Sequence, residues 1–221
     1  MKVRIDCLTL VLLSLVLLSP IKVSGTDTGN SDSEHGFRLR SKTFENGATL
    51  SLSVIATFNS SSGQNICTVD GSPGGNQSPE LSWTGAPHGT QSFVVIMYDI
   101  TASFTHWGMY NISPKTQELP ANAGVAGTTF GIQVANDYGI GDLSYDGPCP
   151  PKSVTPNVHH YVFTVYALDT TLPQIPSFGA FLPGAEALYN ALIAAGQGGH
   201  ILDSASISGF YSAAAPPGPA E

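Results

Sequence analysis

The chain has 221 residues, with 8 basic and 16 acidic side chains and a formal net charge of −8 at pH 7. This length suits a single domain with one sizeable core and is short for two. Because nucleic acids and anionic membrane surfaces both repel a chain this acidic, we expect no nucleic-acid partner and no electrostatic attachment to a membrane.

The first 25 residues have the layout of a secretory signal peptide. Lys2 and Arg4 provide a positive start, an apolar run follows from Leu8 to Leu18, and small residues suited to cleavage end at Gly25. The run is too short for a transmembrane helix, which needs about 20 apolar residues. We predict a signal peptide over residues 1–25, no transmembrane segment, and a secreted protein, either periplasmic or extracellular. Cleavage there would leave five basic and fifteen acidic side chains, a net charge of −10.

Two cysteines remain after this segment. Cys67 and Cys149 form an even pair in a chain expected to be exported, and such pairs are usually oxidised. Metal ligation is the alternative, but it requires further Cys or His ligands at short spacing, which neither cysteine has. We therefore predict a Cys67–Cys149 disulfide and no metal site.

The N-terminal half of the remaining chain is predicted to contain a leader, strands and a long loop. Residues 26–36 are polar and acidic, which predicts a flexible leader. Leu50–Phe58 alternates like a strand, and Thr57–Glu80 is a Ser-, Gly-, Asn- and Pro-rich loop. Phe93–Tyr98 is a continuous apolar run typical of a buried strand, and Trp107–Ile112 is a further strand.

The C-terminal half contains the strongest strand signal and one helix. His160–Leu168 is rich in β-branched and aromatic residues, which predicts a strand buried on both faces. Gly184–Ala195 has apolar residues at helical spacing, and Ile201–Tyr211 is a last strand. Residues 213–221 are Ala- and Pro-rich, which predicts a disordered tail. The fold class is mainly β, a sandwich domain over residues 37–212 with one or two peripheral helices.

Three N-x-[ST] sequons begin at Asn59, Asn76 and Asn111. They matter only if the chain passes through a eukaryotic secretory pathway, where exposed asparagines of such sequons are modified. Asn111 falls in a predicted strand, so Asn59 and Asn76 are the candidate glycosylation sites.

Four separated segments resemble one known family. They are Gly74–Trp83 (GGNQSPELSW), Asp99 with His106-Trp107, Tyr145–Pro151 (YDGPCPP) and His159–Asp169 (HHYVFTVYALD). In this order and spacing they are similar to the phosphatidylethanolamine-binding protein family, and within it to the bacterial-type Raf-kinase-inhibitor-like branch. The resemblance extends from about Phe37 to Tyr211.

The resemblance implies a β-sandwich with a small cavity that accepts phosphate or a phospholipid head group, without a cofactor. Cysteines of the branch support the Cys67–Cys149 pairing, and its members imply a homodimer as a candidate assembly. By motif position, the ligand-binding residues would be Asp99, His106, Gly147, Pro148, Pro150, Pro151, His159 and Tyr161.

The chain departs from the family pattern beside this cavity. The pattern D-P-D-A-P reads Asp99-Ile100-Thr101-Ala102-Ser103 here, so both prolines and the second carboxylate are missing. Without proline to fix φ, we expect this loop to be less rigid. The arginine of the family's H-R-Y pattern is replaced by His160, which strand alternation places on the opposite face from His159.

The chemistry of these residues suits an anion. His106 and His159 can donate hydrogen bonds, Tyr161 adds a hydroxyl, and the turn at Gly147 lets backbone N–H groups approach a ligand. Asp99 beside a histidine is expected to raise the pKa of that histidine, so binding should strengthen as the pH falls.

We expect a binding protein rather than an enzyme. The sequence contains no H-x-x-x-H motif and no serine in G-x-S-x-G, and the resemblance implies binding and regulation. Two functions follow from it. One is binding of a small anionic or phospholipid-like ligand. The other is a protein-interaction module that inhibits or modulates a protease, a kinase or a host protein.

Overall fold

A computed structural model describes residues 36–139, 143–175 and 184–214. The predicted signal peptide, the leader up to residue 35 and the tail from residue 215 lie outside the described residues. The elements in chain order are β1 Arg38–Arg40, β2 Ala48–Thr49, a 3₁₀ turn η1 Leu52–Val54, β3 Leu81–Thr84, β4 Ser92–Asp99, β5 Phe104–Ile112, β6 Glu118–Leu119, β7 Ile132–Gln133, β8 His159–Leu168, α1 Gly184–Gln197 and β9 Ile201–Tyr211.

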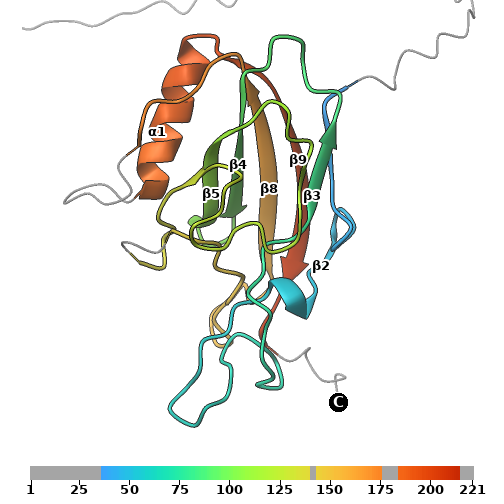
Figure 1. Cartoon of the computed structure of the whole chain (residues 1–221). Helices are drawn as coiled ribbons and strands as arrows, with labels where there is room; N and C mark the ends of the chain where they lie inside the picture. The colour runs from blue at the N-terminus through green and yellow to red at the C-terminus, as the bar shows by residue number, and fades with distance from the viewer. Residues whose placement is uncertain (1–35, 140–142, 176–183, 215–221) are drawn as a thin grey trace, which may run out of the picture. The chain divides into compact units, whose positions relative to one another are not determined.

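The strands form two sheets that face each other. The larger has six strands in the order β2-β9-β8-β4-β5-β7, and the smaller has the order β1-β3-β6. All pairings are antiparallel except that of β2 with β9. Figure 1 shows α1 against one face of the large sheet and β3 against the other. The expected β-sandwich with a peripheral helix is confirmed.

The main core lies between the two sheets. Trp83 on β3 and Phe93 on β4 meet edge to face, with ring centroids 5.2 Å apart. Tyr161, Phe163 and Val165 of β8 are fully buried in this core, whereas the residues between them are partly exposed. The expectation that β8 is buried on both faces is therefore wrong, because only one of its faces lies in the closed core.

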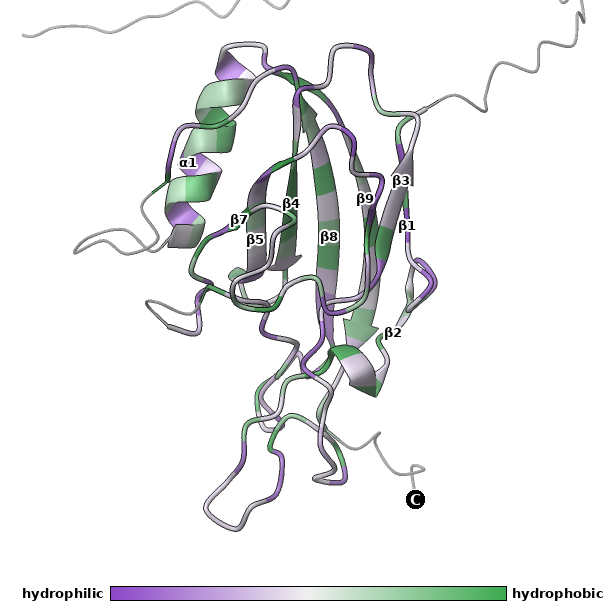
Figure 2. Cartoon of the chain, in the orientation of Figure 1, coloured by the Kyte–Doolittle hydropathy of each residue, from purple (hydrophilic) through white to green (hydrophobic). Residues whose placement is uncertain are grey.

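The opposite face of the large sheet packs against α1. Leu188 and Leu192 of the helix share one apolar cluster with Val94, Ile96 and Tyr110 of β4 and β5. Apolar and polar bands alternate along α1 (Figure 2), as expected for a helix with one face on a sheet. The predicted helix is confirmed and extends to Gln197.

One predicted strand is wrong. Leu50–Phe58 contains η1 followed by buried extended chain that pairs with no strand among the described residues. Two glycine-containing loops pack directly against its backbone. A Cβ atom at Gly74 would overlap the carbonyl oxygen of Ile55, and a Cβ atom at Gly147 would overlap the carbonyl oxygen of Val54. The alternation of apolar residues here reflects burial beneath other loops rather than pairing in a sheet.

The C-terminal strand is confirmed with the predicted bounds, but the domain does not end with it. Ala213, which the composition assigns to a disordered tail, is only 1% exposed and belongs to the main core. The packed part of the chain therefore includes Ala213.

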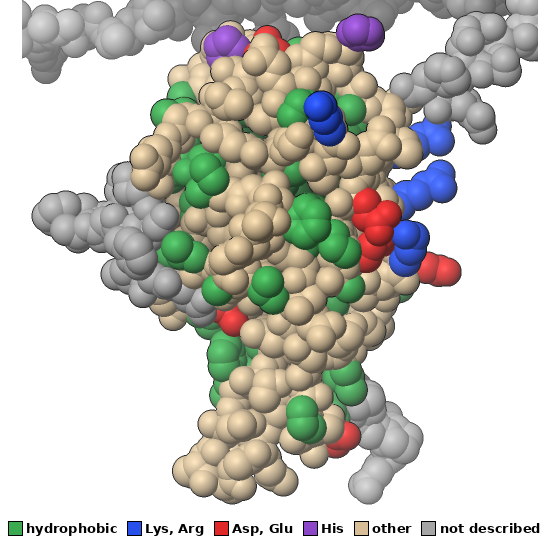
Figure 3. All heavy atoms as spheres, viewed as in Figure 1, with side chains coloured by type: hydrophobic (Ala, Val, Ile, Leu, Met, Phe, Trp, Pro, Cys, Tyr) green, Lys and Arg blue, Asp and Glu red, His purple; other side chains and the backbone are tan. Residues whose placement is uncertain are grey.

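The predicted disulfide is present between Cys67 and Cys149, whose Cα atoms are 4.4 Å apart. It joins the long loop before β3 to the segment before β8. Within the described residues, no helix is long and apolar enough to cross a membrane. On the face drawn in Figure 3, basic and acidic side chains gather along one edge. Lys42 Nζ lies 3.5 Å from carboxylate oxygens of both Glu80 and Glu118.

Candidate functional site

A cavity of about 200 Å³ opens where three neighbouring strands of the large sheet meet the loops. Asp99 ends β4 and is paired with Tyr161 of β8, which begins at His159. His106 reaches the cavity from β5, on the other side of β4. Strand pairing thus gathers side chains that are far apart in the sequence. The lining residues are Asp99, Ala102, Phe104, His106, Tyr138, Cys149, Pro150, Pro151, His159 and Tyr161.

The Asp99 carboxylate holds both a histidine and a loop. Its Oδ2 lies 2.6 Å from Nδ1 of His159, and both side chains are buried. Its Oδ1 accepts the backbone N–H groups of Thr101 and Ala102 at 2.9 and 3.1 Å. Because Nδ1 of His159 faces Asp99, Nε2 is the ring nitrogen left for a ligand.

His106 is oriented by a backbone carbonyl. Its Nδ1 lies 2.8 Å from the carbonyl oxygen of Asp146, which can only accept, so Nδ1 donates the proton. Burial lowers the pKa of His106 to about 4, against the opposing effects of the Asp146 carbonyl and the Asp99 charge. His106 is therefore neutral at physiological pH, and its Nε2 is an acceptor. The expected rise in pKa beside Asp99 does not hold for this histidine.

Asp146 positions His106 and is itself held by two amides. Asn76 donates to its Oδ1 at 3.0 Å, and Asn136 donates to its Oδ2 at 2.8 Å. The Asn76 Oδ1 atom also accepts the N–H of Gly147 at 2.8 Å. This network fixes the segment whose carbonyl group orients the imidazole.

Aromatic rings form much of the cavity wall. Tyr138 meets Phe104 and His106 edge-on, with centroids 4.7 and 5.4 Å apart, and its hydroxyl donates to the Gly147 carbonyl at 3.2 Å. Burial raises the pKa of Tyr138 and of Tyr161, and the Asp99 charge adds to both shifts, so both phenols stay protonated. The lining residues include one carboxylate and neither Lys nor Arg.

Comparison with known proteins identifies the fold family. A family profile described as "Phosphatidylethanolamine-binding protein" matches residues 40–212, which include every lining residue of the cavity. The chain belongs to this family. The crystal structure of E. coli YbcL, described as a member of the mammalian PEBP family, superposes with a TM-score of 0.61 at 31% identity. That superposition covers 80% of this chain and 98% of YbcL.

Sequence relatives of this family member come from bacteria and archaea. UPF0098 protein YbcL of Escherichia coli is 44% identical over 108 residues, which span 45% of this chain and 57% of YbcL. A UPF0098 protein of Aquifex aeolicus is 37% identical over 156 residues, which span 67% of this chain and 82% of that protein. The bacterial-type branch predicted from the motifs is thus confirmed.

The structure brings most of the predicted site residues together. Asp99, His106, Pro150, Pro151, His159 and Tyr161 line the cavity. Gly147 and Pro148 do not line it. The Gly147 N–H is bonded to Asn76, and the Pro148 carbonyl accepts the Ala56 N–H, so both residues brace the cavity wall. The predicted approach of the Gly147 N–H to a ligand is therefore not available.

Several lining residues were missed by sequence reasoning. Phe104 and Tyr138 have no motif of their own, and their place depends on how β5 and the following loop pack. Asp146, which is not a lining residue but orients His106, is signalled only by its position in the YDGPCPP segment. Cys149 was predicted as a disulfide partner and turns out to line the cavity as well.

The residues that depart from the family pattern are tied down by hydrogen bonds. Thr101 Oγ1 accepts the backbone N–H of His160 at 3.0 Å, and the Ile100 N–H donates to the His160 carbonyl at 3.0 Å. These bonds fasten the loop to β8 at the positions where the pattern would have its first proline and its second aspartate. The His160 ring stacks on Phe210, away from His159, as strand alternation predicts.

The sequons differ in how free their amides are. Asn59 is exposed, whereas the Asn76 amide is bonded to Asp146, so the structure argues against Asn76 as a glycosylation site. Asn111 lies in β5 and donates to the Leu172 carbonyl. Among the described residues, no group of three or more His, Cys, Asp or Glu side chains is arranged to hold a metal ion.

Proposed function

We propose that this chain is an exported binding protein whose cavity takes a small phosphate-containing group, either free phosphate or the head group of a phospholipid. The Asp99–His159 pair carries the proposal. The buried Asp99 carboxylate fixes the His159 ring through Nδ1, so the opposite ring nitrogen, Nε2, is the group that meets the anion. The description of the family names a ligand that contains both a phosphate and an ammonium group.

The remaining polar groups suit such a mixed ligand better than a bare dianion. The Tyr161 hydroxyl stays protonated and is hydrogen-bonded to the Asp99 side chain, so its oxygen, like Nε2 of the neutral His106, offers an acceptor to a ligand. Asp99 repels a dianion, and the lining residues provide no Lys or Arg to offset it. The ligand therefore carries phosphate oxygens together with a donor, which is a P–OH or an ammonium group.

The test is a calorimetric titration with glycerophosphoethanolamine, which carries one phosphodiester charge and one ammonium group. We expect saturable binding of one equivalent at pH 7, where His106 is neutral and its Nε2 can accept from the ammonium group. A titration without saturable binding would contradict the proposal.

Matched variants locate the effect. His159→Ala should weaken binding at least about tenfold, the value of one charge-assisted hydrogen bond. His200→Ala is the control, because His200 forms a similar pair with Asp169, with an Nδ1–Oδ1 distance of 2.8 Å, but at an exposed position. If both variants lost the same affinity, or if His159→Ala lost none, the cavity would not be the binding site.

A second candidate function is modulation of another protein through the long loop before β3. Ile66 and Val69 are each about half exposed there and offer apolar side chains to a partner. A native mass spectrum of the purified protein separates the two functions. A mass increase from a bound small ligand supports the binding function. A complex with a co-purified protein, without a bound small ligand, supports modulation of another protein.

A further inference from the structure

A second and larger hollow, which we call the β9 groove, lies beside the end of the last strand. It has a volume of about 690 Å³. Four apolar side chains in its wall, Leu52, Val69, Val158 and Phe210, are 47%, 48%, 51% and 36% exposed. Such a cluster on a free chain needs an occupant, since contiguous exposed apolar surface usually marks a binding site. The remaining lining residues are Thr49, Thr68, Asp70, Asn157, Tyr211, Ser212 and Ala214.

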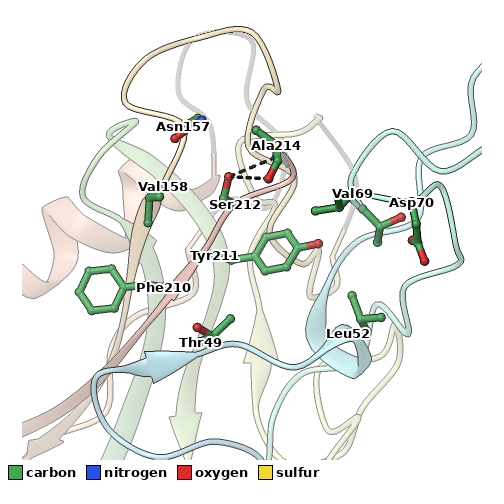
Figure 4. Close-up of a pocket in the computed structure, with 11 residues that line it drawn as sticks. Thr49, Leu52, Val69, Asp70, Asn157, Val158, Phe210, Tyr211, Ser212 and Ala214 are labelled. Carbon is green, nitrogen blue, oxygen red and sulfur yellow. Dashed lines mark hydrogen bonds between the residues drawn. The ribbon is translucent and has the colours of Figure 1, made fainter. Parts of the chain in front are cut away.

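Two aromatic rings in the groove are held in place before anything binds. Phe210 stacks on His160 with ring centroids 4.4 Å apart and planes 18° apart. The Tyr211 hydroxyl donates to the Cys67 carbonyl at 3.0 Å. Figure 4 shows the Tyr211 ring lying between Val158 on one side and Val69 on the other. The groove is thus a preformed apolar trough with aromatic walls.

The chain itself enters this groove at its C-terminal end. Ala214, the last described residue, is one of the lining residues, and its N–H donates to Ser212 Oγ at 3.1 Å. The chain then continues as Ala215-Pro216-Pro217-Gly218-Pro219-Ala220-Glu221. The family match ends at residue 212, so this segment is an addition to the family domain.

We propose that residues 215–221 dock into the β9 groove, so that the chain covers its own apolar surface. Proline-rich segments pack on aromatic-lined grooves because their extended conformation loses little entropy on binding. Seven residues in that conformation reach about 22 Å at about 3.1 Å per residue. Since the segment starts at the groove wall, its effective concentration there is in the millimolar range and a weak contact suffices.

The test compares ¹⁵N-labelled protein from residue 26 to 221 with a form that ends at Ala214. We expect the deletion to shift the backbone amide signals of Val69, Val158 and Phe210 and to leave those of α1 unchanged. In the longer form, the amides of Gly218 and Ala220 should relax like those of the domain. A synthetic peptide of residues 215–221 should reverse the shifts in the shortened form and leave the longer form unaffected.

Matched variants separate docking from disturbance of the fold. Val158→Asp places a charge in the groove wall and should free the tail, which would give Gly218 and Ala220 the relaxation of an unbound chain. Ile193→Asp is the control, because Ile193 is 57% exposed on α1. Identical groove signals in the two lengths would overturn the proposal. Shifts that grow with protein concentration would also overturn it, because they would assign the groove to the tail of a second copy.

Discussion

The histidines of this chain have different roles because their surroundings differ. His106 is 3% exposed and its Nδ1 is committed to a carbonyl group, which makes its Nε2 an acceptor at neutral pH. The Nδ1 atom of His159 lies 2.6 Å from the Asp99 carboxylate, which leaves Nε2 as the ring nitrogen available to a ligand. His200 forms the same type of pair with Asp169 at an exposed position, where solvent screens the interaction. One residue type thus provides a neutral acceptor, a ring fixed by a buried carboxylate and a surface contact.

The buried His106 should make stability depend on pH. Its pKa is about 4 in the folded chain and 6.5 when unperturbed, so between these values the unfolded chain binds more protons. Its contribution is fully present above about pH 6.5 and is lost as the pH falls towards 4. The loss amounts to about 3 kcal/mol at about 1.4 kcal/mol per pKa unit. Urea unfolding at several pH values measures it.

The variant His106→Asn isolates this effect, because the Asn amide can still donate to the Asp146 carbonyl but does not titrate. We expect it to be less stable than the parent at pH 7 and to lose less stability on acidification. His200→Asn is the exposed control and should keep the pH slope of the parent. The interpretation is wrong if the parent and His106→Asn have parallel pH profiles.

At the scale of elements, contact between α1 and β5 depends on a glycine within the strand. A Cβ atom at Gly108 would lie 2.7 Å from Val134 Cγ2 and 2.9 Å from Leu188 Cδ2. These distances are too short for unstrained contacts, so a side chain at this position would have to displace Val134 and Leu188. Gly108 therefore leaves room for the present packing of α1 on the large sheet.

We expect Gly108→Ala to destabilise the fold by about 1 to 3 kcal/mol, the usual cost of overpacking a core. The lower part of this range applies if the side chains of Val134 and Leu188 can shift. The urea midpoint measures the change. Gly139→Ala is the matched control, since a Cβ atom there meets nothing within 4 Å. Equal midpoints for the two variants would show that α1 does not rest on Gly108.

The predictable elements are those whose packing leaves a periodic trace in the sequence. α1 shows helical spacing because one stripe covers the sheet. The burial of β8 alternates, but its sequence is rich in β-branched and aromatic residues throughout, so the sequence predicted the strand and not its half-exposed face. Leu50–Phe58 shows alternation as well, but loops bury it rather than a neighbouring strand. Periodicity reports burial and not the identity of the covering element, so sequence reasoning could not distinguish the two cases.

The cavity was predictable only where motifs mark its residues. Asp99, His106 and His159 belong to segments that resemble the family, and strand pairing brings them together as expected. Tyr138 comes from a loop whose path depends on long-range contacts with Phe104 and His106, so no local pattern predicts it. Burial also determines the neutral state of His106, and the sequence does not show how deeply a side chain lies.

At the scale of the whole molecule, the disulfide connects the cavity to the β9 groove. Cys149 lines the cavity, and it is bonded to Cys67, whose carbonyl accepts the hydroxyl of Tyr211 in the groove. Thr68, the next residue, also lines the groove. The bond therefore holds the segment that carries Pro150 and Pro151 against the end of β9.

Removing this bond should affect both stability and ligand binding. The bonded residues are separated by 82 positions, and a disulfide that closes a loop of this length contributes on the order of 4 kcal/mol in chain-entropy models. The double variant Cys67→Ala/Cys149→Ala should lose about that much by urea unfolding. It should also bind glycerophosphoethanolamine more weakly than the oxidised parent, because the Pro150–Pro151 wall is no longer anchored. The parent treated with a thiol reductant should reproduce both changes. Unchanged affinity in a destabilised variant would show that the wall is held by the Asn76–Gly147 contact instead.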